Sequence, residues 1–303
     1  MAAITKSTLF PDELAKEMFS KVTGHSSLAK LSASEPVPFC GKDTFVFDFS
    51  NEVSVVGESG QKPAGDATIT SVPMKPVKII YQSRITDEFL KASKEKQLEY
   101  LTSFADGFKK KVGAGLDKMA LHGVNPATGS AASTIIGNNH LDYVIANYSS
   151  GANLITLEHD STEIDENIEE ALAKVEDAEY EVNGIIMAPA ARTKMANLKQ
   201  NSGERKYPDF AFGAFPTVLG NGALDVNPTV SANSNKARVY VGDFQNAFKW
   251  GYADEIPLEI IEYGDPDGAG TDLKNVNQIL LRSEVYIGWA FLNAAAFAEV
   301  KNS

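Results

Sequence analysis

The strongest structural signal in this chain of 303 residues is a run of alternating aromatic side chains. Phe45, Phe47 and Phe49 are separated by single residues, and Val53 and Val55 continue at a spacing of two. Because successive side chains of a β-strand point to opposite faces, this spacing predicts a strand with one apolar face. Such a strand needs a pairing strand and a surface that covers its apolar side.

The chain after this strand predicts a turn and a returning strand. Residues 57–66 (GESGQKPAGD) are rich in glycine, and residues 68–81 carry apolar side chains in an extended pattern. Pro73 and Pro76 interrupt that pattern, and proline lacks the N–H group that a central strand uses for pairing. We therefore expect a long two-stranded hairpin over residues 44–82, with its return strand at an edge or broken at the prolines.

A hairpin of this length is expected to pack against another molecule. An isolated two-stranded hairpin is only marginally stable in water. The sequence leaves one alternative open, which is a hairpin folded back onto its own domain.

Two further segments flank the hairpin. Residues 1–43 have too few large apolar side chains to fold alone, so they are predicted to form an arm that lies on another surface. Residues 87–121 are predicted to form a long helix, because Thr86 is a suitable cap and apolar residues recur mostly at intervals of three or four. The predicted stripe comprises Leu90, Leu98, Leu101, Phe104, Phe108, Val112, Leu116 and Met119.

The remaining segments contain both helices and strands. Helices are predicted over residues 162–180 and 190–198, with a short buried strand over residues 185–188 between them. Residues 238–261 and 278–291 are predicted to form the last strands. A strand-rich chain with one dominant helix belongs to the α+β class.

The charge balance argues against a general nucleic-acid-binding protein unless the positive charge is strongly segregated. Lys and Arg number 28 against 40 Asp and Glu, which gives a net charge of −12. Such a surface repels phosphate backbones. The single cysteine, Cys40, excludes an intrachain disulfide and a thiolate metal cluster.

The sequence predicts a protein that is made and kept in a reducing cytoplasm. Its first residues, MAAITK, are soon followed by Pro11, which does not fit the apolar core of a signal peptide. The most apolar stretch, residues 285–300, is too short for a membrane span and contains Asn293 and Glu299.

The histidines do not form a recognisable catalytic or metal-binding pattern. His25, His122, His140 and His159 lack a partner histidine at a spacing of four, and only His159 has an adjacent acid. A single His-Asp dipeptide is a weak motif, so a structural role is expected for it.

Other candidate motifs also fail on spacing. Residues 57–60 resemble a nucleophile elbow, but no glycine lies two positions after Ser59. The loop that begins at Asp265 resembles a calcium loop, but Val276 occupies the position of the bidentate acid. The acids between Glu163 and Glu181 are predicted to form a solvated helix face. The sequence therefore predicts no enzyme, and no catalytic, cofactor-binding or metal-binding residues.

Several short segments follow one another in a recognisable order. They are VKIIYQS at 77–83, DKMALHG at 117–123, PATG at 126–129, IIMAP at 185–189, KMANLK at 194–199, NSGERKY at 201–207, VGDF at 241–244 and LRSE at 281–284. Together with the arm, the hairpin and the long helix, this order resembles the HK97-fold family of major capsid proteins of tailed bacteriophages. The resemblance covers residues 45–301. It departs from the family pattern at Tyr286, where a second arginine is frequent.

The resemblance implies an α+β fold of the HK97 type with defined parts. Residues 1–43 would be the N-terminal arm, and residues 44–82 the extended hairpin loop laid over a neighbouring subunit. Residues 83–141 and 251–303 would form the peripheral domain, with the spine helix at 87–121. Residues 142–250 would form the axial domain.

The implied function is structural. The chain would self-assemble into pentamers and hexamers of an icosahedral phage head that encloses double-stranded DNA without sequence-specific binding. It would be located in the virion shell after assembly in the cytoplasm of the bacterial host, without a membrane or a cofactor. Expected partners are many copies of itself, a separate scaffolding protein, a portal and decoration proteins.

The family also implies a cross-link that this sequence does not favour. Some members of this family form a covalent bond between a hairpin lysine and an asparagine, assisted by a glutamate. In this chain, Lys62 and Lys75 lie on the predicted hairpin. Residues 268–278 contain no glutamate, so we predict no cross-link. The alternatives to a phage shell are an encapsulin-like cellular compartment and, from another class, a small-molecule hydrolase. A hydrolase would stop at a small oligomer.

Overall fold

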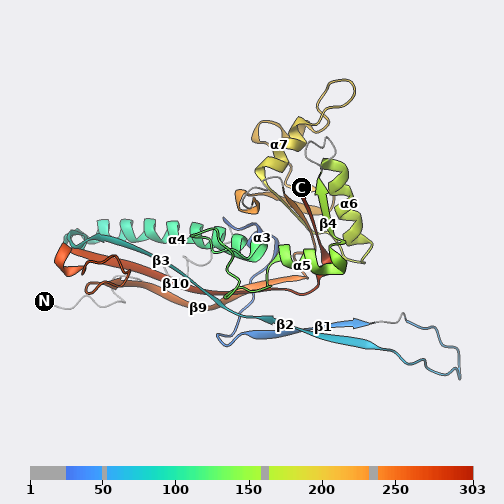
Figure 1. Cartoon of the computed structure of the whole chain (residues 1–303), viewed down its shortest axis with the longest axis horizontal. Coiled ribbons are helices and arrows are strands. Elements are labelled where there is room, and N and C mark those ends of the chain that lie inside the picture. Colours follow the sequence, from blue (N-terminus) through green and yellow to red (C-terminus); the bar gives the residue numbers. More distant parts are fainter. Residues whose placement is uncertain (1–24, 50–52, 158–163, 232–237, 303) are drawn as a thin grey trace.

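The computed structural model describes residues 25–49, 53–157, 164–231 and 238–302. A long helix on a sheet forms an elongated layer, and a second sheet with its own helices stands on one end of it (Figure 1). A two-stranded ribbon runs below both parts and extends beyond them (Figure 1). The mixture of helices with largely antiparallel strands confirms the predicted α+β class.

The elongated layer consists of helix α4 on one face of a three-stranded antiparallel sheet. Its elements are β3 (Val77–Thr86), α4 (Lys94–His122), β9 (Phe248–Ile261) and β10 (Gln278–Phe291), in the strand order β3-β10-β9. The apolar stripe of α4 and alternate residues of β10 are buried in one cluster, which includes Leu101, Phe108, Val112, Leu116, Leu281, Val285, Ile287 and Trp289. This alternation is the pattern of a sheet with one covered face.

The predicted start of the long helix was wrong. Residues 87–91 form a short 3-10 helix, η2 (Asp87–Lys91), and the chain is extended again at Ala92. Helix α4 begins after Ser93, whose side chain accepts a hydrogen bond from the amide of Lys96. A serine cap at this position competes with the Thr86 cap that the sequence suggested. The predicted end is accurate to one residue, with Gly123 as a left-handed cap.

The second sheet has six strands in the order β4-β11-β8-β5-β7-β6. The strands are β4 (Leu154–Leu157), β5 (Gly184–Met187), β6 (Val218–Leu219), β7 (Gly222–Val226), β8 (Val239–Gly242) and β11 (Phe297–Asn302). The associated helices are α5 (Leu141–Asn147), α6 (Ile164–Glu176) and α7 (Pro189–Asn197), with short turns η4 (Pro208–Gly213) and η5 (Pro228–Val230). Helix α6 packs on this sheet through Ile164, Ile168, Ala171 and Val175.

The last strand lies outside the part to which the sequence assigned it. Strand β11 falls within residues 251–303, which were expected to be peripheral, but it pairs with β8 and β4 of the six-stranded sheet. The chain leaves β10 through Asn293 and the short turn η7 (Ala294–Ala296) to make this change of sheet. Pairing between strands so far apart in sequence is not visible in local patterns.

The described part of the N-terminal segment packs on the body of the same chain. Helix α3 (Ser27–Leu31) buries Leu28 and Leu31, and Ser34 forms a β-bridge with Trp250 of β9. At this crossing a Cβ atom on Gly251 would lie 1.6 Å from the carbonyl oxygen of Glu35. Only glycine permits so close a backbone approach. Residues 1–24 of the predicted arm lie outside the described residues.

The hairpin is shorter than predicted on its return side. It consists of β1 (Lys42–Phe49) and β2 (Ala67–Met74), which pair only with each other. Pairing with β1 ends at Met74, and residues 77–82, expected in the hairpin, belong to β3 of the three-stranded sheet. The break lies at Lys75 and Pro76, where the sequence had indicated an interruption.

Candidate assembly surface

The hairpin presents its aromatic residues on one face. Phe47 lies opposite Ile69 in the β1–β2 register, and Phe45 and Phe49 flank it on the same side of the ribbon. Residues directly opposite each other in an antiparallel pair point to the same face. The register therefore collects these four side chains into one surface, which we call the aromatic face.

The aromatic face is exposed to solvent. The exposed fractions are 62% for Phe45, 58% for Phe47, 75% for Phe49 and 59% for Ile69. Val53, beyond the end of β1, is 96% exposed. Contiguous exposed apolar surface of this kind marks a site of interaction with another molecule. The alternative of a hairpin folded into its own domain does not agree with these exposures.

The hairpin is attached to the body at its base. Met74 is buried in a small cluster with Val37 of the arm and Ala290 of β10. Gly41 has a φ of +87° where the chain turns into β1. The base is thus fixed, while the aromatic face beyond it is held away from the body.

The free end of the hairpin borders an open hollow rather than a packed contact. This hollow of about 940 Å³ is lined by Phe47, Phe49, Val53 and other hairpin residues, together with Glu179 after α6. A volume of this size is far larger than the space between packed side chains. The hollow leaves the aromatic face accessible to a partner.

A buried carboxylate ties the arm to the spine helix. Asp117 of α4 accepts hydrogen bonds from the hydroxyl of Ser26 at 2.5 Å and from the amides of Ser27 at 2.9 Å and Leu28 at 3.2 Å. It also accepts one from the hydroxyl of Thr229 in η5 at 2.8 Å. Burial raises the pKa of Asp117, although these donors favour its charged form.

A second buried polar cluster joins the long helix to the six-stranded sheet. Arg238, just before β8, donates to Asp142 of α5 at 2.8 Å and lies 3.4 Å from Glu299 of β11. The hydroxyl of Tyr240 donates to Asp142 at 2.5 Å. His122, the last residue of α4, has its Nδ1 atom 3.0 Å from the same carboxylate. One network therefore joins four segments of the chain, which are α4, α5, the segment of β8 and β11.

The two acids of this cluster have opposite pKa shifts. Burial opposes ionisation of Asp142, but the contacts with His122 and Arg238 outweigh it and hold the pKa of Asp142 below its ordinary value. Burial, reinforced by the negative charge of Asp142, raises the pKa of Glu299 to about 7. Glu299 is 1% exposed and the side chain of Arg238 is 11% exposed, so most of this network is enclosed. We interpret it as a structural junction.

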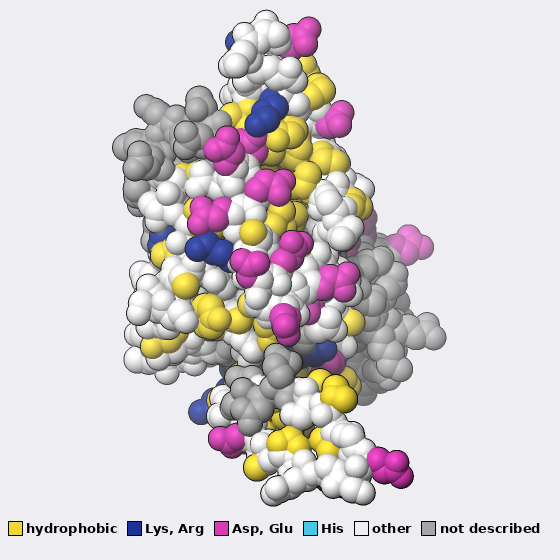
Figure 2. Space-filling view, turned by 90° about the vertical axis from the view of Figure 1, so that its right-hand side faces the viewer, with side chains coloured by type: hydrophobic (Ala, Val, Ile, Leu, Met, Phe, Trp, Pro, Cys, Tyr) yellow, Lys and Arg dark blue, Asp and Glu magenta, His cyan; other side chains and the backbone are white. Residues whose placement is uncertain are grey.

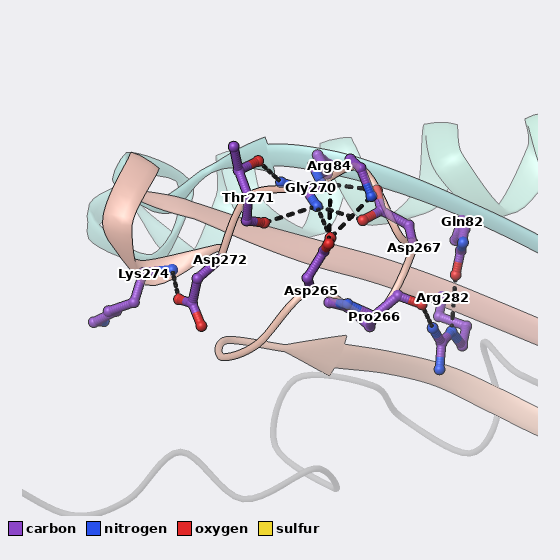
Figure 3. A network of polar contacts seen from close by, with 11 residues as sticks. Gln82, Arg84, Asp265, Pro266, Asp267, Gly270, Thr271, Asp272, Lys274 and Arg282 are labelled. Carbon is purple, nitrogen blue, oxygen red and sulfur yellow. Dashed lines mark hydrogen bonds and ion pairs between the residues drawn. The ribbon is translucent and has the colours of Figure 1, made fainter.

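The loop with a calcium-like pattern is organised by an arginine (Figure 3). Arg84 of β3 forms ion pairs with Asp267 and with Asp265, the latter at 2.7 Å, and donates to Thr271 at 3.0 Å. Asp265 also accepts hydrogen bonds from the loop amides of Ala269 and Gly270. A guanidinium lies between the two carboxylates, and the segment forms the turn that the sequence predicted. The absence of a calcium site at this loop stays a prediction.

The structure separates the other residues that the sequence singled out. His140 caps α5 by accepting from the amide of Tyr143, and His25 is exposed beside α3. Ser59 lies in the exposed turn at the end of the hairpin. His159 lies outside the described residues. The predictions for these residues as structural rather than catalytic stay predictions.

The described part of the chain offers neither a metal-binding cluster nor a membrane-spanning helix. Within residues 25–49, 53–157, 164–231 and 238–302, no group of three or more His, Cys, Asp or Glu side chains is placed to hold a metal ion. In the same ranges no helix has both the length and the apolar character that crossing a bilayer requires. Lys62 and Lys75 are exposed on the hairpin, and the absence of a cross-link stays a prediction.

Sequence reasoning missed the residues that hold the junctions. Asp117 lies four positions before Leu121, which is buried, so helical spacing alone could have placed this acid on the buried face. Glu299 lies between Ala298 and Val300 in strand β11, which pairs with β4 on one side and β8 on the other. Only the pairing in the sheet shows that Glu299 is buried. Arg238 has no signal of its own in the sequence.

Comparison with known proteins gives one family. A model of the "Phage capsid family" matches residues 7–302. No curated protein matches the chain.

Solved structures of similar shape come from phages and from a related particle. A structure from Mycobacterium phage Ogopogo is 30% identical, covers 92% of each chain and has a TM-score of 0.73. One from Gordonia phage Cozz is 23% identical, covers 92% of this chain and 87% of its own, and has a TM-score of 0.73. A capsid of a native GTA particle, computed with C5 symmetry, is 14% identical over 91% of this chain and 90% of its own, with a TM-score of 0.60. At the two lower identities the likeness concerns the fold alone.

Proposed function

The chain belongs to the phage capsid family, and from this premise we propose that it assembles into the pentamers and hexamers of an icosahedral phage head around double-stranded DNA. Membership in the family makes it a structural protein of the virion shell that associates with copies of itself. The finer statements about ring size and cargo are our proposal.

The exposed aromatic face is the observation that carries this proposal. Phe45, Phe47 and Phe49 are all more than half exposed in the single chain. Burying apolar surface contributes about 25 cal/mol per Å² before the costs of association are subtracted. A neighbouring subunit can cover this face, and a contact between two different surfaces repeats around a closed ring.

We assign the parts of the proposed shell protein from the two sheets. The three-stranded sheet with α4 is the peripheral domain, and the six-stranded sheet with α6 and α7 is the axial domain around the symmetry axes. The capsid of a native GTA particle, computed with C5 symmetry, has a similar fold, which supports a shell arrangement for a chain of this kind. Strand β11 then belongs to the axial domain.

The remaining parts of the proposal concern partners and the place of assembly. A separate scaffolding protein, a portal and decoration proteins complete the head, which forms in the cytoplasm of the bacterial host. The acidic balance of 40 acids against 28 bases supports a container that does not bind its DNA tightly.

Sedimentation and negative-stain electron microscopy of the purified chain test this function. With a scaffolding protein present we expect rings and closed particles of megadalton size. A chain that sediments only as a monomer or as a small closed oligomer, with and without scaffold, would contradict the proposal. Uniform particles from the chain expressed alone would contradict the part of the proposal that requires a separate scaffolding protein.

A further inference from the structure

Helix α6 forms one wall of a surface groove on the second sheet. The groove, of about 340 Å³, lies between α6 and the turn that joins β6 to β7. Leu172, Val182 and Leu219 supply apolar lining, and Glu169 and Glu176 are exposed on the α6 side. The volume is in the range of sites that accept a small apolar group with polar neighbours.

The surface around this groove is acidic. Figure 2 looks at the side of the molecule on which α6 lies and shows acidic side chains gathered there, with apolar side chains exposed between them. The exposed acids of α6 and the residues after it are Glu166, Glu169, Glu170, Glu176, Asp177, Glu179 and Glu181. Lys174 is the base within α6, and it lies 3.4 Å from Glu170. A partner with positive charge is favoured at such a surface, and one with negative charge is repelled.

A turn next to the same sheet carries an exposed aromatic side chain beside a base. Phe212, in the turn η4, is 99% exposed, although its neighbour Phe210 is buried. Its φ angle is 55°, which is uncommon and costly for a bulky residue. The guanidinium of Arg205 lies 5.4 Å from the centre of the Phe212 ring. We call Arg205 and Phe212 the aromatic knob.

The segment that carries the knob is basic. Between residues 192 and 212 the bases are Arg192, Lys194, Lys199, Arg205 and Lys206, and the acids are Glu204 and Asp209. Lys206 is already paired with Asp165 at the start of α6. The segment that ends at this exposed aromatic ring therefore carries an excess of positive charge.

We propose that the aromatic knob of one copy inserts into the acidic groove of the next copy around a ring. The ring of Phe212 is covered by the apolar lining of the groove, and Arg205 lies beside Glu169 and Glu176. The knob does not occupy the groove of its own chain, because Phe212 is almost fully exposed there. A contact between two different surfaces of the same protein is of the kind that closes into rings. This inference rests on the proposed function and names a second, separate contact from the hairpin.

Charge reversal on both sides of the contact tests the inference. Glu169→Arg with Glu176→Arg, or Arg205→Glu, should each raise the subunit concentration needed for ring and particle formation at least tenfold. The chain that carries all three changes should recover assembly, because the charges are again complementary. Glu88→Arg, an exposed acid near the start of the long helix, is the matched control and should assemble normally.

A second variant controls for the local structural change that replacing Arg205 would cause. Arg205 also donates to the carbonyl oxygen of Ala196 at 2.7 Å, so its replacement disturbs the turn as well as the contact. Phe212→Ser removes a ring that is 99% exposed and leaves the hydrogen bond from Arg205 to Ala196 in place. It should weaken assembly at least tenfold while circular dichroism and the melting temperature of the free subunit stay unchanged.

Mixing the two single-sided variants gives a sharper result. In a mixed ring, a groove with reversed charge fits a knob with reversed charge, and an unaltered groove fits an unaltered knob. Both contacts are satisfied only when the two variants alternate, which requires an even number of subunits. Native mass spectrometry should therefore detect mixed six-membered rings and no mixed five-membered rings.

The outcomes separate this inference from the shell function. Normal particles from the Phe212→Ser and groove variants would overturn the knob-in-groove contact while the shell function stands. Sensitivity that is seen only when a scaffolding protein is present, with rings of the chain alone unaffected, would assign the groove to that protein and would also overturn it. A chain that fails to assemble in its unaltered form would contradict the shell function itself.

Discussion

Strands β2 and β3 follow each other with only Lys75 and Pro76 between them, yet they belong to two different structures. Strand β2 pairs with β1 alone, and the aromatic face of that ribbon is open to solvent. Strand β3 pairs with β10, and α4 packs over one face of their sheet. The same antiparallel pairing leaves the apolar face in water in one case, and in the other it packs Val77, Ile79 and Ile85 against the core. This contrast supports our proposal that a surface from another copy covers the hairpin.

The largest expected effect comes from removing the aromatic face. Replacing Phe45, Phe47 and Phe49 by serine should abolish particle formation, because the loss is repeated at every copy in the shell. The free subunit should keep its unfolding free energy to within about 1 kcal/mol, since these side chains are already exposed. Leu281→Ala in the covered sheet is the matched comparison and should cost about 3–5 kcal/mol. Denaturant titration and sedimentation measure the two quantities, and a hairpin variant that destabilises the subunit as strongly as Leu281→Ala would contradict the comparison.

The arm contact should come next in size. Asp117→Ala leaves the hydroxyls of Ser26 and Thr229 and two arm amides without their acceptor inside the protein. We expect a loss of about 3 kcal/mol in the unfolding free energy, and faster hydrogen exchange at Ser27 and Leu28. Asp177→Asn, at an exposed acid after α6, is the control. Unchanged exchange at the two amides would show that Asp117 does not hold the arm.

The buried junction predicts a dependence on pH. The pKa of Glu299 is raised to about 7 in the folded chain, so the folded state binds this proton more tightly than the unfolded state does. Stability from this group is present at low pH and is lost as pH rises through about 7.

Glu299→Gln removes this titration. Denaturation at a series of pH values should show the variant gaining about 1–3 kcal/mol relative to the unaltered chain between pH of about 5 and about 8. Glu88→Gln changes an exposed acid, so its difference in unfolding free energy from the unaltered chain should not change with pH. A difference for Glu299→Gln that does not change with pH would contradict the buried acid.

The smallest effect is expected at the far end of the covered sheet. Arg84→Gln removes the cation that holds the loop of Asp265 and Asp267 together. Because this network lies at the surface, the global unfolding free energy should fall by less than about 1 kcal/mol. The amides of Ala269 and Gly270 should exchange faster, and assembly should then report whether the ordered loop takes part in a contact. Unchanged exchange would mean that the loop is ordered without Arg84.

The sequence predicted those features that depend on local periodicity. The alternation from Phe45 to Phe49 gave the hairpin, and the helical stripe through Phe108 and Leu116 gave the long helix. The start of that helix was wrong because Thr86 and Ser93 are both good caps, and only tertiary packing selects one of them. The phage capsid resemblance and the HK97-type α+β fold were confirmed by the family and structural matches.

Features that depend on contacts between remote segments were not predictable. Strand β11 looks like a continuation of β10, and its place between β4 and β8 follows from pairings with segments far earlier in the chain. Glu299 is buried for the same reason, since its neighbours Asp142 and Arg238 come from α5 and from the residue before β8. Helical spacing could have placed Asp117 on a buried face, but its partners in the arm are remote in sequence. In the sequence, Phe212 is an ordinary apolar residue of a loop. Only the fold shows that its side chain is exposed.

Oxidative footprinting of the hairpin, read by mass spectrometry, tests the central claim most directly. It measures the solvent exposure of Phe45, Phe47 and Phe49 in free subunits and in assembled particles of the unaltered chain. We predict that the three rings are oxidised readily in the free subunit and at least tenfold more slowly in particles, while Tyr263, exposed in another loop, serves as an internal reference. Equal oxidation of the three rings in both states would contradict the claim that a neighbouring copy covers the aromatic face.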